Sequence, residues 1–175
     1  MNTSRLGLAL MHLLAKLPLP VLRGIGWGVG RLLFILAAPR RKIALRNLEL
    51  CFPEVPAAQR RAWAKETFVV FCQTFIDRSW LWFGSEALVR SRVQLTGALH
   101  ELEGDTATIV FAPHFYSMDA GGLALPLNTP REFTSIFATN PDPVLDAWFM
   151  AGRQRFGNVR MLNRADGVKP IIQCL

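Results

Sequence analysis

A histidine and an aspartate stand five residues apart in the stretch FAPHFYSMDAGG, residues 111–122. His114 follows an apolar run and a proline, and Asp119 falls in or near the first turn of an expected helix. A carboxylate in that position is favoured by the helix dipole and tends to stay ionised. If the carboxylate accepts a hydrogen bond from Nδ1–H of the imidazole, Nε2 is left free as a base. Such a pair could deprotonate a hydroxyl that attacks an activated acyl group, with no serine nucleophile on the enzyme.

The spacing alone leaves other interpretations open. Asp119 could merely cap a helix while His114 fills the end of a strand, because a lone HxxxxD is a weak pattern. A metal site is disfavoured, since His12 and His100 are the only other histidines and neither is near. The three cysteines have neither CxxC nor metal-ligand spacing, so we expect reduced, packed thiols and no structural zinc.

Strands that alternate with helices are expected to position the pair. Strands are predicted near 93–97, 106–113, 133–139 and 158–164, and helices near 117–127, 143–156 and from 168. This order predicts an α/β domain over residues 39–175, with a mainly parallel sheet flanked by helices. In such sheets, sites collect at the carboxyl ends of the strands, which is where His114 falls. An aromatic-rich helix over 53–84 is predicted to pack in the core.

The N-terminal residues 1–38 form an apolar tract that basic side chains interrupt. Residues 1–50 hold eight Lys and Arg against one acid, whereas residues 51–175 hold twelve of each sign, so the net charge of +7 arises entirely from the N-terminal part. Basic residues interleaved with apolar ones favour an anionic membrane surface over nucleic acid. We therefore predict a membrane-associated N-terminal helix, either spanning or interfacial, with the cluster PRRKIALRN (39–47) on the cytoplasmic side.

The glycines of GIGWGVG (24–30) invite a dinucleotide-binding interpretation. They alternate, no convincing strand precedes them, and no ribose-binding acid follows in context. Close packing of small residues on one side of a membrane helix is the favoured explanation.

Four stretches together resemble one known family. They are APHFYSMDAGG (112–122), RNLELCFPE (46–54), NPDPVLDAWFMAGRQRFG (140–157) and RMLNRADGVKPII (160–172). The chain resembles the lauroyl/myristoyl acyltransferases of lipid A biosynthesis, a branch of the HxxxxD membrane acyltransferases. The resemblance implies a glycerolipid-acyltransferase-like fold on the cytoplasmic face of the inner membrane. It also implies transfer of a fatty acyl chain from acyl carrier protein to a hydroxyl of a Kdo-bearing lipid A precursor, without metal or diffusible cofactor.

The resemblance assigns roles to particular residues. It makes His114 the general base and Asp119 the residue that orients it, and the acceptor hydroxyl then attacks the thioester directly. Arg164 takes the place of a second-motif arginine that binds the acceptor's phosphate. Arg153 and Arg155 lie one helix earlier and could bind the same head group, because guanidinium groups match phosphate geometry.

Leu175 falls inside a helix that is expected to have just begun, so we expect a C-terminally truncated member of the family. The alternative is a catalytically inactive, membrane-associated fragment. A soluble α/β hydrolase is disfavoured because no GxSxG is present. A nucleic-acid binder is disfavoured because residues 51–175 are neutral overall.

Overall fold

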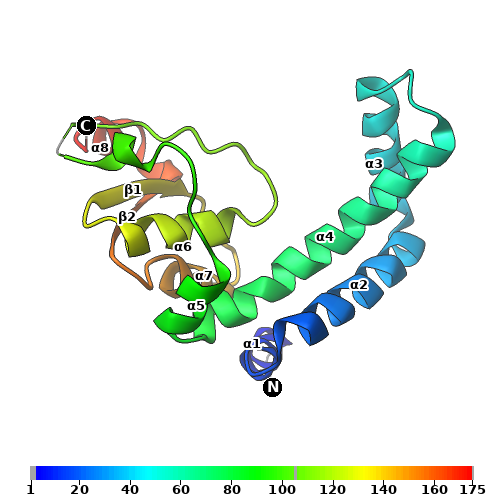
Figure 1. Ribbon diagram of the computed structural model, residues 1–175, viewed down its shortest axis with the longest axis horizontal. Helices are drawn as coiled ribbons and strands as arrows, with labels where there is room; N and C mark the ends of the chain where they lie inside the picture. Colours follow the sequence, from blue (N-terminus) through cyan, green and yellow to red (C-terminus); the bar gives the residue numbers. More distant parts are fainter. Residues whose placement is uncertain (1–2, 105, 175) are drawn as a thin grey trace. The chain divides into compact units, whose positions relative to one another are not determined.

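The computed structural model describes residues 3–104 and 106–174, and Figure 1 shows their helices and strands. The elements are α1 (Thr3–Leu14), α2 (Leu19–Leu36), α3 (Ala38–Cys51), α4 (Ala57–Phe83), α5 (Glu86–Arg92), α6 (Met118–Asn128), β1 (Glu132–Phe137), α7 (Pro143–Arg153), β2 (Asn158–Asn163) and α8 (Lys169–Ile172), with short 3-10 turns η1 (Leu99–Leu102) and η2 (Arg164–Asp166). The chain divides into two compact units, one of Leu17–Asp77 and one of Met1–Lys16 with Arg78–Leu175. The two units are described separately below.

The helical unit, Leu17–Asp77, is built on close packing between α2 and α4. Gly26 and Gly30 of α2 lie against the backbone of α4, where a Cβ on Gly30 would stand 2.5 Å from the Cα of Val69. A Cβ on Gly26 would stand 2.9 Å from the Cα of Gln73. The close packing predicted for the glycine-rich stretch is therefore confirmed at these two positions, because only glycine permits such an approach.

An ion pair between a partly exposed arginine and a buried aspartate adds polar specificity to this packing. Arg23 of α2 donates from Nη2 to Oδ2 of the buried Asp77 at 2.8 Å. Gln73 donates from Nε2 to the carbonyl oxygen of Arg23 at 3.0 Å. A buried carboxylate needs a charged partner to offset its lost hydration, so this pair favours one alignment of the two helices.

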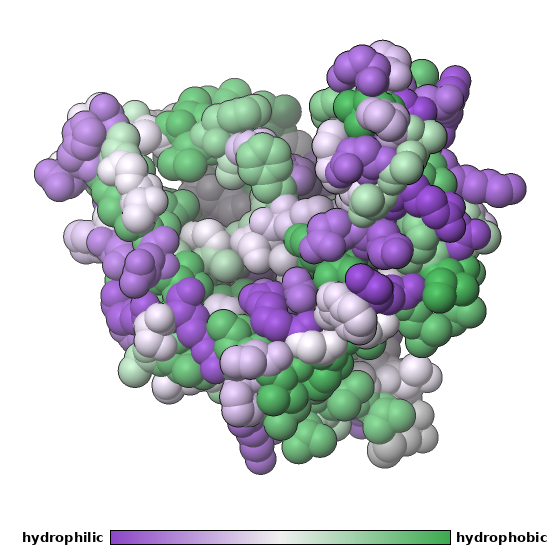
Figure 2. Space-filling model, turned by 45° about the vertical axis from the view of Figure 1, so that its right-hand side comes forward, coloured by the Kyte–Doolittle hydropathy of each residue, from purple (hydrophilic) through white to green (hydrophobic). Residues whose placement is uncertain are grey.

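Helix α2 is long and apolar enough to cross a membrane, by length and composition. It is 18 residues long, and only 22% of that window is buried within the protein. Its exposed apolar side chains include Trp27, Leu32, Ile35 and Leu36, and such apolar surface appears in green in Figure 2. The basic side chains Arg40, Arg41, Lys42 and Arg46 follow on α3, which buries no residue. An apolar helix followed by a basic one matches the predicted N-terminal membrane association.

The second unit contains the sheet. Strands β1 and β2 pair in parallel, from Glu132 opposite Asn158 to Phe137 opposite Asn163, and α7 connects them. Figure 1 shows the two strands side by side, with α6 and α7 next to them. The predicted parallel pairing and the helices before and between the two strands are confirmed. The sheet has two strands among the described residues, which is smaller than the predicted one.

The predicted strands near 93–97 and 106–113 are absent from the sheet in the part of the chain that the structure describes. Residues 106–113 instead form a connection without helix or strand, in which Ile109 is 79% and Phe111 89% exposed. The apolar run predicted a buried strand, but among the described residues it pairs with no strand, and its apolar side chains are exposed. Arg131, just before β1, contacts the beginning of this segment through the carbonyl oxygen of Thr106 and the hydroxyl of Thr108.

Aromatic packing joins the last turn of α4 to α7 within this unit. The rings of Trp82 and Trp148 meet edge to face at 4.4 Å between centroids, and Phe149 meets Trp82 at 5.4 Å. Gly152 allows this contact, because a Cβ there would lie 2.3 Å from the Trp82 ring. Burial of three large aromatic side chains fixes α7, and with it the crossover between the strands, against α4.

The four glycines of α2 provide a matched test of its packing. We expect Gly30→Ala and Gly26→Ala each to destabilise the protein by roughly 1–3 kcal/mol, because the new methyl group meets the backbone of α4. Gly24→Ala and Gly28→Ala are the controls, since nothing lies within 4 Å of either added Cβ. These two changes should be neutral or stabilise by about 0.5–1 kcal/mol, as expected for alanine in a helix. Thermal unfolding in detergent micelles measures all four, and equal effects at the four positions would contradict the packing.

Candidate functional site

The candidate site lies at the carboxyl ends of the two strands, beside the first turn of α6 and the last turn of α7. Asn163 at the end of β2 donates from Nδ2 to Oγ1 of Thr139 at 2.5 Å, which ties the two strand ends together. A small pocket of about 170 Å³ opens here, with Phe137, Asn140, Phe149 and Arg153 among its lining residues. The carboxyl edge of a parallel sheet is the usual place for a site in α/β proteins.

Asp119 is held by two arginines from different helices. Arg78 of α4 donates from Nε to Oδ2 at 2.7 Å, and Arg153 of α7 donates from Nε to Oδ1 at 3.2 Å. The Asp119 side chain is only 12% exposed. The carboxylate therefore links α4, α6 and α7 through charge-assisted hydrogen bonds. Because an ionised carboxylate has about four lone-pair sites, it can still accept a further donor.

The ring of Phe149 lies within this cluster of charges. The guanidinium carbon of Arg153 is 5.4 Å from the ring centroid, and that of Arg78 is 5.8 Å away. Arg78 also lies 5.7 Å from the ring of Trp82. Guanidinium groups at this distance from aromatic rings gain cation–π stabilisation, so the rings help fix both arginines around Asp119.

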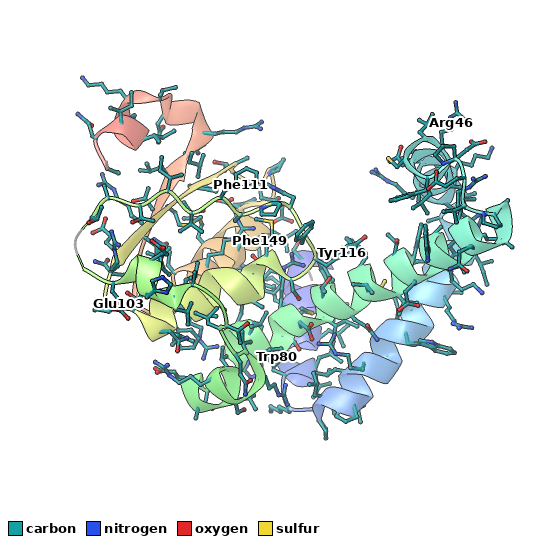
Figure 3. The ribbon with its side chains drawn as sticks, turned by 45° about the horizontal axis from the view of Figure 1, so that its top comes forward. Arg46, Trp80, Glu103, Phe111, Tyr116 and Phe149 are labelled. Atoms are coloured by element: carbon teal, nitrogen blue, oxygen red, sulfur yellow. The ribbon has the colours of Figure 1, made fainter. Side chains whose placement is uncertain are left out.

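His114 lies on the long connection before α6 and is exposed. Phe111 and Tyr116, labelled in Figure 3, belong to the same connection, and burial raises the pKa of the Tyr116 hydroxyl. Among the interactions of the described residues, none joins His114 to Asp119: the two arginines occupy the carboxylate instead. The structure thus brings Asp119 and Arg153 together, and it leaves His114 near them in sequence but without a hydrogen bond to the carboxylate.

A strained residue separates the two members of the motif. Ser117 has φ 65° and ψ 25°, and it is the one non-glycine residue with positive φ in the described part of the chain. It stands at the N-cap of α6, yet its side chain makes no capping hydrogen bond. Left-handed backbone at a non-glycine residue costs roughly 1–2 kcal/mol, and such strain is often found at functional sites.

The other two predicted arginines have different surroundings. Arg155 donates from Nη1 to the carbonyl oxygen of Leu81 at 2.9 Å and from Nη2 to that of Gly84, and burial lowers its pKa. It therefore caps the end of α4, where unpaired carbonyl groups favour a cation. Arg164 begins η2 directly after β2 and is exposed. It lies at the carboxyl edge of the sheet, and substrate binding by either arginine stays a prediction.

Sequence reasoning did not identify Arg78. Its spacing from Asp119 is 41 residues, so no local pattern joins them. The available signal was a charged residue inside the apolar run FIDRSWLWF (75–83), where an arginine needs a partner.

A larger cavity lies near the other end of α6. It has a volume of about 710 Å³, and its apolar lining includes Leu95, Leu99, Leu102 and Leu125. Arg131 and Asn128 add polar groups to its wall. A cavity of this size and lining suits an aliphatic chain.

The fold and site together define a class of protein: an α/β protein that has one helix apolar enough to cross a membrane, by length and composition, and ionised groups gathered at the carboxyl edge of a parallel sheet. More particularly, the chain belongs to the bacterial lipid A biosynthesis acyltransferase family, whose model matches residues 2–175. The family resemblance predicted from its motifs is confirmed.

Several relatives support this membership. The chain is 33% identical to the lipid A biosynthesis acyltransferase of Haemophilus influenzae over 92% of its length and 52% of that protein. It is 27% identical to the lipid A biosynthesis lauroyltransferase of Escherichia coli, over 97% of the chain and 55% of that protein. It is 31% identical to the lipid A biosynthesis myristoyltransferase of the same organism, over 88% of the chain and 47% of that protein. The chain thus spans about half the length of these relatives, and no solved structure matches it.

The strain at Ser117 can be tested by a glycine substitution. We expect Ser117→Gly to stabilise the protein by about 0.5–1 kcal/mol, because glycine adopts positive φ without a Cβ clash and no capping bond is lost. Ser85→Gly is the matched control, since Ser85 caps α5 in an extended conformation and accepts from the Leu88 amide. That change should cost a few tenths of a kcal/mol. The melting temperatures of the two variants distinguish these effects. A lower melting temperature for Ser117→Gly than for the wild type would contradict backbone strain at Ser117.

Proposed function

We propose that this chain carries out acyl transfer in lipid A biosynthesis: a fatty acyl chain passes from acyl carrier protein to a hydroxyl of a Kdo-bearing lipid A precursor. The observation that carries the proposal is the family match over residues 2–175, which includes the HxxxxD motif and the arginines around it. Relatives bear the names lauroyltransferase and myristoyltransferase of lipid A biosynthesis. No metal or cofactor is required by the reaction.

The reaction uses His114 as general base. Its Nε2 takes the proton of the acceptor hydroxyl as the oxygen attacks the thioester carbonyl carbon. The C–O bond forms, the tetrahedral intermediate collapses, and the C–S bond breaks. The imidazolium then returns its proton to the leaving thiolate. Asp119 accepts a hydrogen bond from Nδ1–H and stabilises the positive charge on the ring. Because the acceptor hydroxyl attacks the thioester directly, no acyl-enzyme forms.

The reaction requires His114 to approach Asp119, and the segment before it offers a route. Residues 106–113 begin beside Arg131 at the start of β1. One edge of β1 pairs with β2, and the other has no strand among the described residues. If the segment runs parallel to β1 from this contact, its end at Pro113 lies beside the end of β1 at Phe137. His114 then reaches the pocket that Arg153 lines. Catalytic hydrogen bonds are often incomplete without substrate.

The remaining groups of the site bind the two substrates. Arg153 and Arg164 bind the phosphate of the acceptor, because exposed guanidinium groups at a sheet edge match its charge and geometry. Arg155 lies close to Arg153 in sequence and adds to the positive potential there. The cavity lined by leucines near the end of α6 takes the aliphatic part of a substrate.

The proposed location is the cytoplasmic face of the inner membrane. Exposed apolar side chains of α2 meet the hydrocarbon region, and the basic side chains of α3 meet anionic lipid head groups. The side of the membrane follows from the position of this basic cluster directly after the apolar helix.

A second candidate is a membrane-associated fragment without activity. The observation that favours it is the separation of His114 from Asp119, together with a sheet of two strands among the described residues. Both candidates have the same membrane-associated surface. They differ in whether the chain catalyses acyl transfer.

The experiment is acyl transfer from acyl carrier protein to a lipid A precursor, with membranes that carry the chain. Transfer should occur with the wild type and fall at least about 100-fold in His114→Ala, as expected when a general base is lost. His100→Ala is the control, because His100 is exposed and lies on η1, outside the HxxxxD motif. Transfer that is unchanged in His114→Ala would contradict the assignment of the base. No transfer by the wild type would favour the inactive fragment.

A further inference from the structure

The two arginines that hold Asp119 do not hold it alike. Arg78 approaches Oδ2 to 2.7 Å, and its side chain is 23% exposed. Arg153 approaches Oδ1 only to 3.2 Å, and its side chain is 37% exposed and lines the pocket. A short, shielded ion pair is harder to break than a longer one in contact with water.

The positions of the two arginines in the fold match this difference. Arg78 lies in the last two turns of the 27-residue α4, among the rings of Trp82 and Phe149. Arg153 is the last residue of α7, where a long side chain can turn from the carboxylate towards the pocket. Asp146 also lines this pocket, and its Oδ1 accepts a hydrogen bond from the backbone N–H of Asn140 at 2.7 Å. An incoming phosphate would compete with Asp119 for Arg153, and Asp146 provides a second carboxylate beside the pocket.

We propose that Arg78 is a positioning residue of the acyltransferase site, which holds Oδ2 of Asp119 permanently, while Arg153 exchanges Oδ1 of Asp119 for a phosphate group of the substrate. The freed Oδ1 then accepts a hydrogen bond from Nδ1–H of His114. This inference rests on the proposed function. It assigns Arg78 to the orientation of Asp119 and Arg153 to the binding of the phosphate.

The exchange couples substrate binding to assembly of the base. Without a phosphate group, both oxygens of Asp119 accept from arginines, as they do in this structure. With a phosphate group on Arg153, Asp119 keeps one arginine and gains the imidazole. The phosphate could belong to the lipid acceptor or to the phosphopantetheine arm of the donor, and the kinetic experiment separates these sources.

The kinetic test compares Arg78→Gln with Arg153→Gln. We expect Arg78→Gln to lower kcat about 10- to 100-fold with little change in either KM, because Asp119 loses its fixed orientation. Arg78→Lys should recover part of that loss by restoring the charge. Arg153→Gln should raise one KM about 10-fold: the KM of the lipid acceptor if the acceptor supplies the phosphate, or that of the acyl donor if the donor supplies it. Equal changes of kcat and KM in the two variants would overturn the division of roles.

Arg90→Gln is the matched control for a general loss of stability. Arg90 donates from Nε to Glu86 at 2.7 Å and from Nη2 to the carbonyl oxygen of Leu127 near the end of α6. The control therefore removes an ion pair of the same length and a contact to the same helix. Its kcat should match that of the wild type. If Arg78→Gln loses no more activity than this control, Arg78 has no positioning role.

A measurement without turnover separates this inference from the proposed function. A double-mutant cycle compares the melting temperatures of Arg78→Gln, of Asp119→Asn and of the variant with both changes. If the two residues are coupled, the double variant melts no lower than the less stable of the two single variants. Purely additive shifts would overturn the permanent pairing whether or not transfer occurs. Coupling without any wild-type transfer would reject the proposed reaction and the catalytic part of the inference, and would leave the pairing established. Wild-type transfer that Arg78→Gln does not alter would reject this inference alone.

Discussion

The ion-pair cluster of Arg78, Asp119 and Arg153 is the interaction on which the candidate site depends. It joins the end of α4, the first turn of α6 and the last turn of α7 through one carboxylate. The packing of Trp82 against Trp148 also joins α4 to α7, but such apolar contacts do not specify direction. Charge-assisted hydrogen bonds do, so the cluster fixes where the first turn of α6 lies relative to the strand ends. The aromatic rings around the arginines shield it from water and strengthen it.

The helical unit, Leu17–Asp77, has a different physical constraint, which is the exposed apolar surface of α2. Its α2 is apolar over 18 residues and yet buries little of that surface within the protein. Gly26 and Gly30 let it approach α4 closely, and the ion pair of Arg23 with the buried Asp77 sets the alignment of the two helices. The rest of the apolar surface of α2 stays exposed. Relatives of this chain bear the names of lipid A biosynthesis enzymes, and the proposed membrane association would cover this apolar surface.

Local patterns predicted much of this architecture. The helix ended by Gly84, the helix after Asp142 and the two paired strands carry their periodicity and caps in the sequence, and the structure has all of them. The strand predicted at 106–113 has the right composition, but a strand also needs a neighbour, and composition does not supply one. His114 and Asp119 were visible as a motif. Arg78 was not, because its pairing spans 41 residues and arises only when α4 and α6 pack.

The measurement that tests the account most directly is a double-mutant cycle on kcat between His114 and Asp119. Acyl transfer would be measured for His114→Ala, for Asp119→Asn and for the variant with both changes. If the carboxylate acts through the imidazole, the second change adds almost nothing once the first is made, so the double variant transfers as slowly as His114→Ala. Losses that multiply would mean that the two side chains act independently, and Asp119 would then serve only to anchor the arginines.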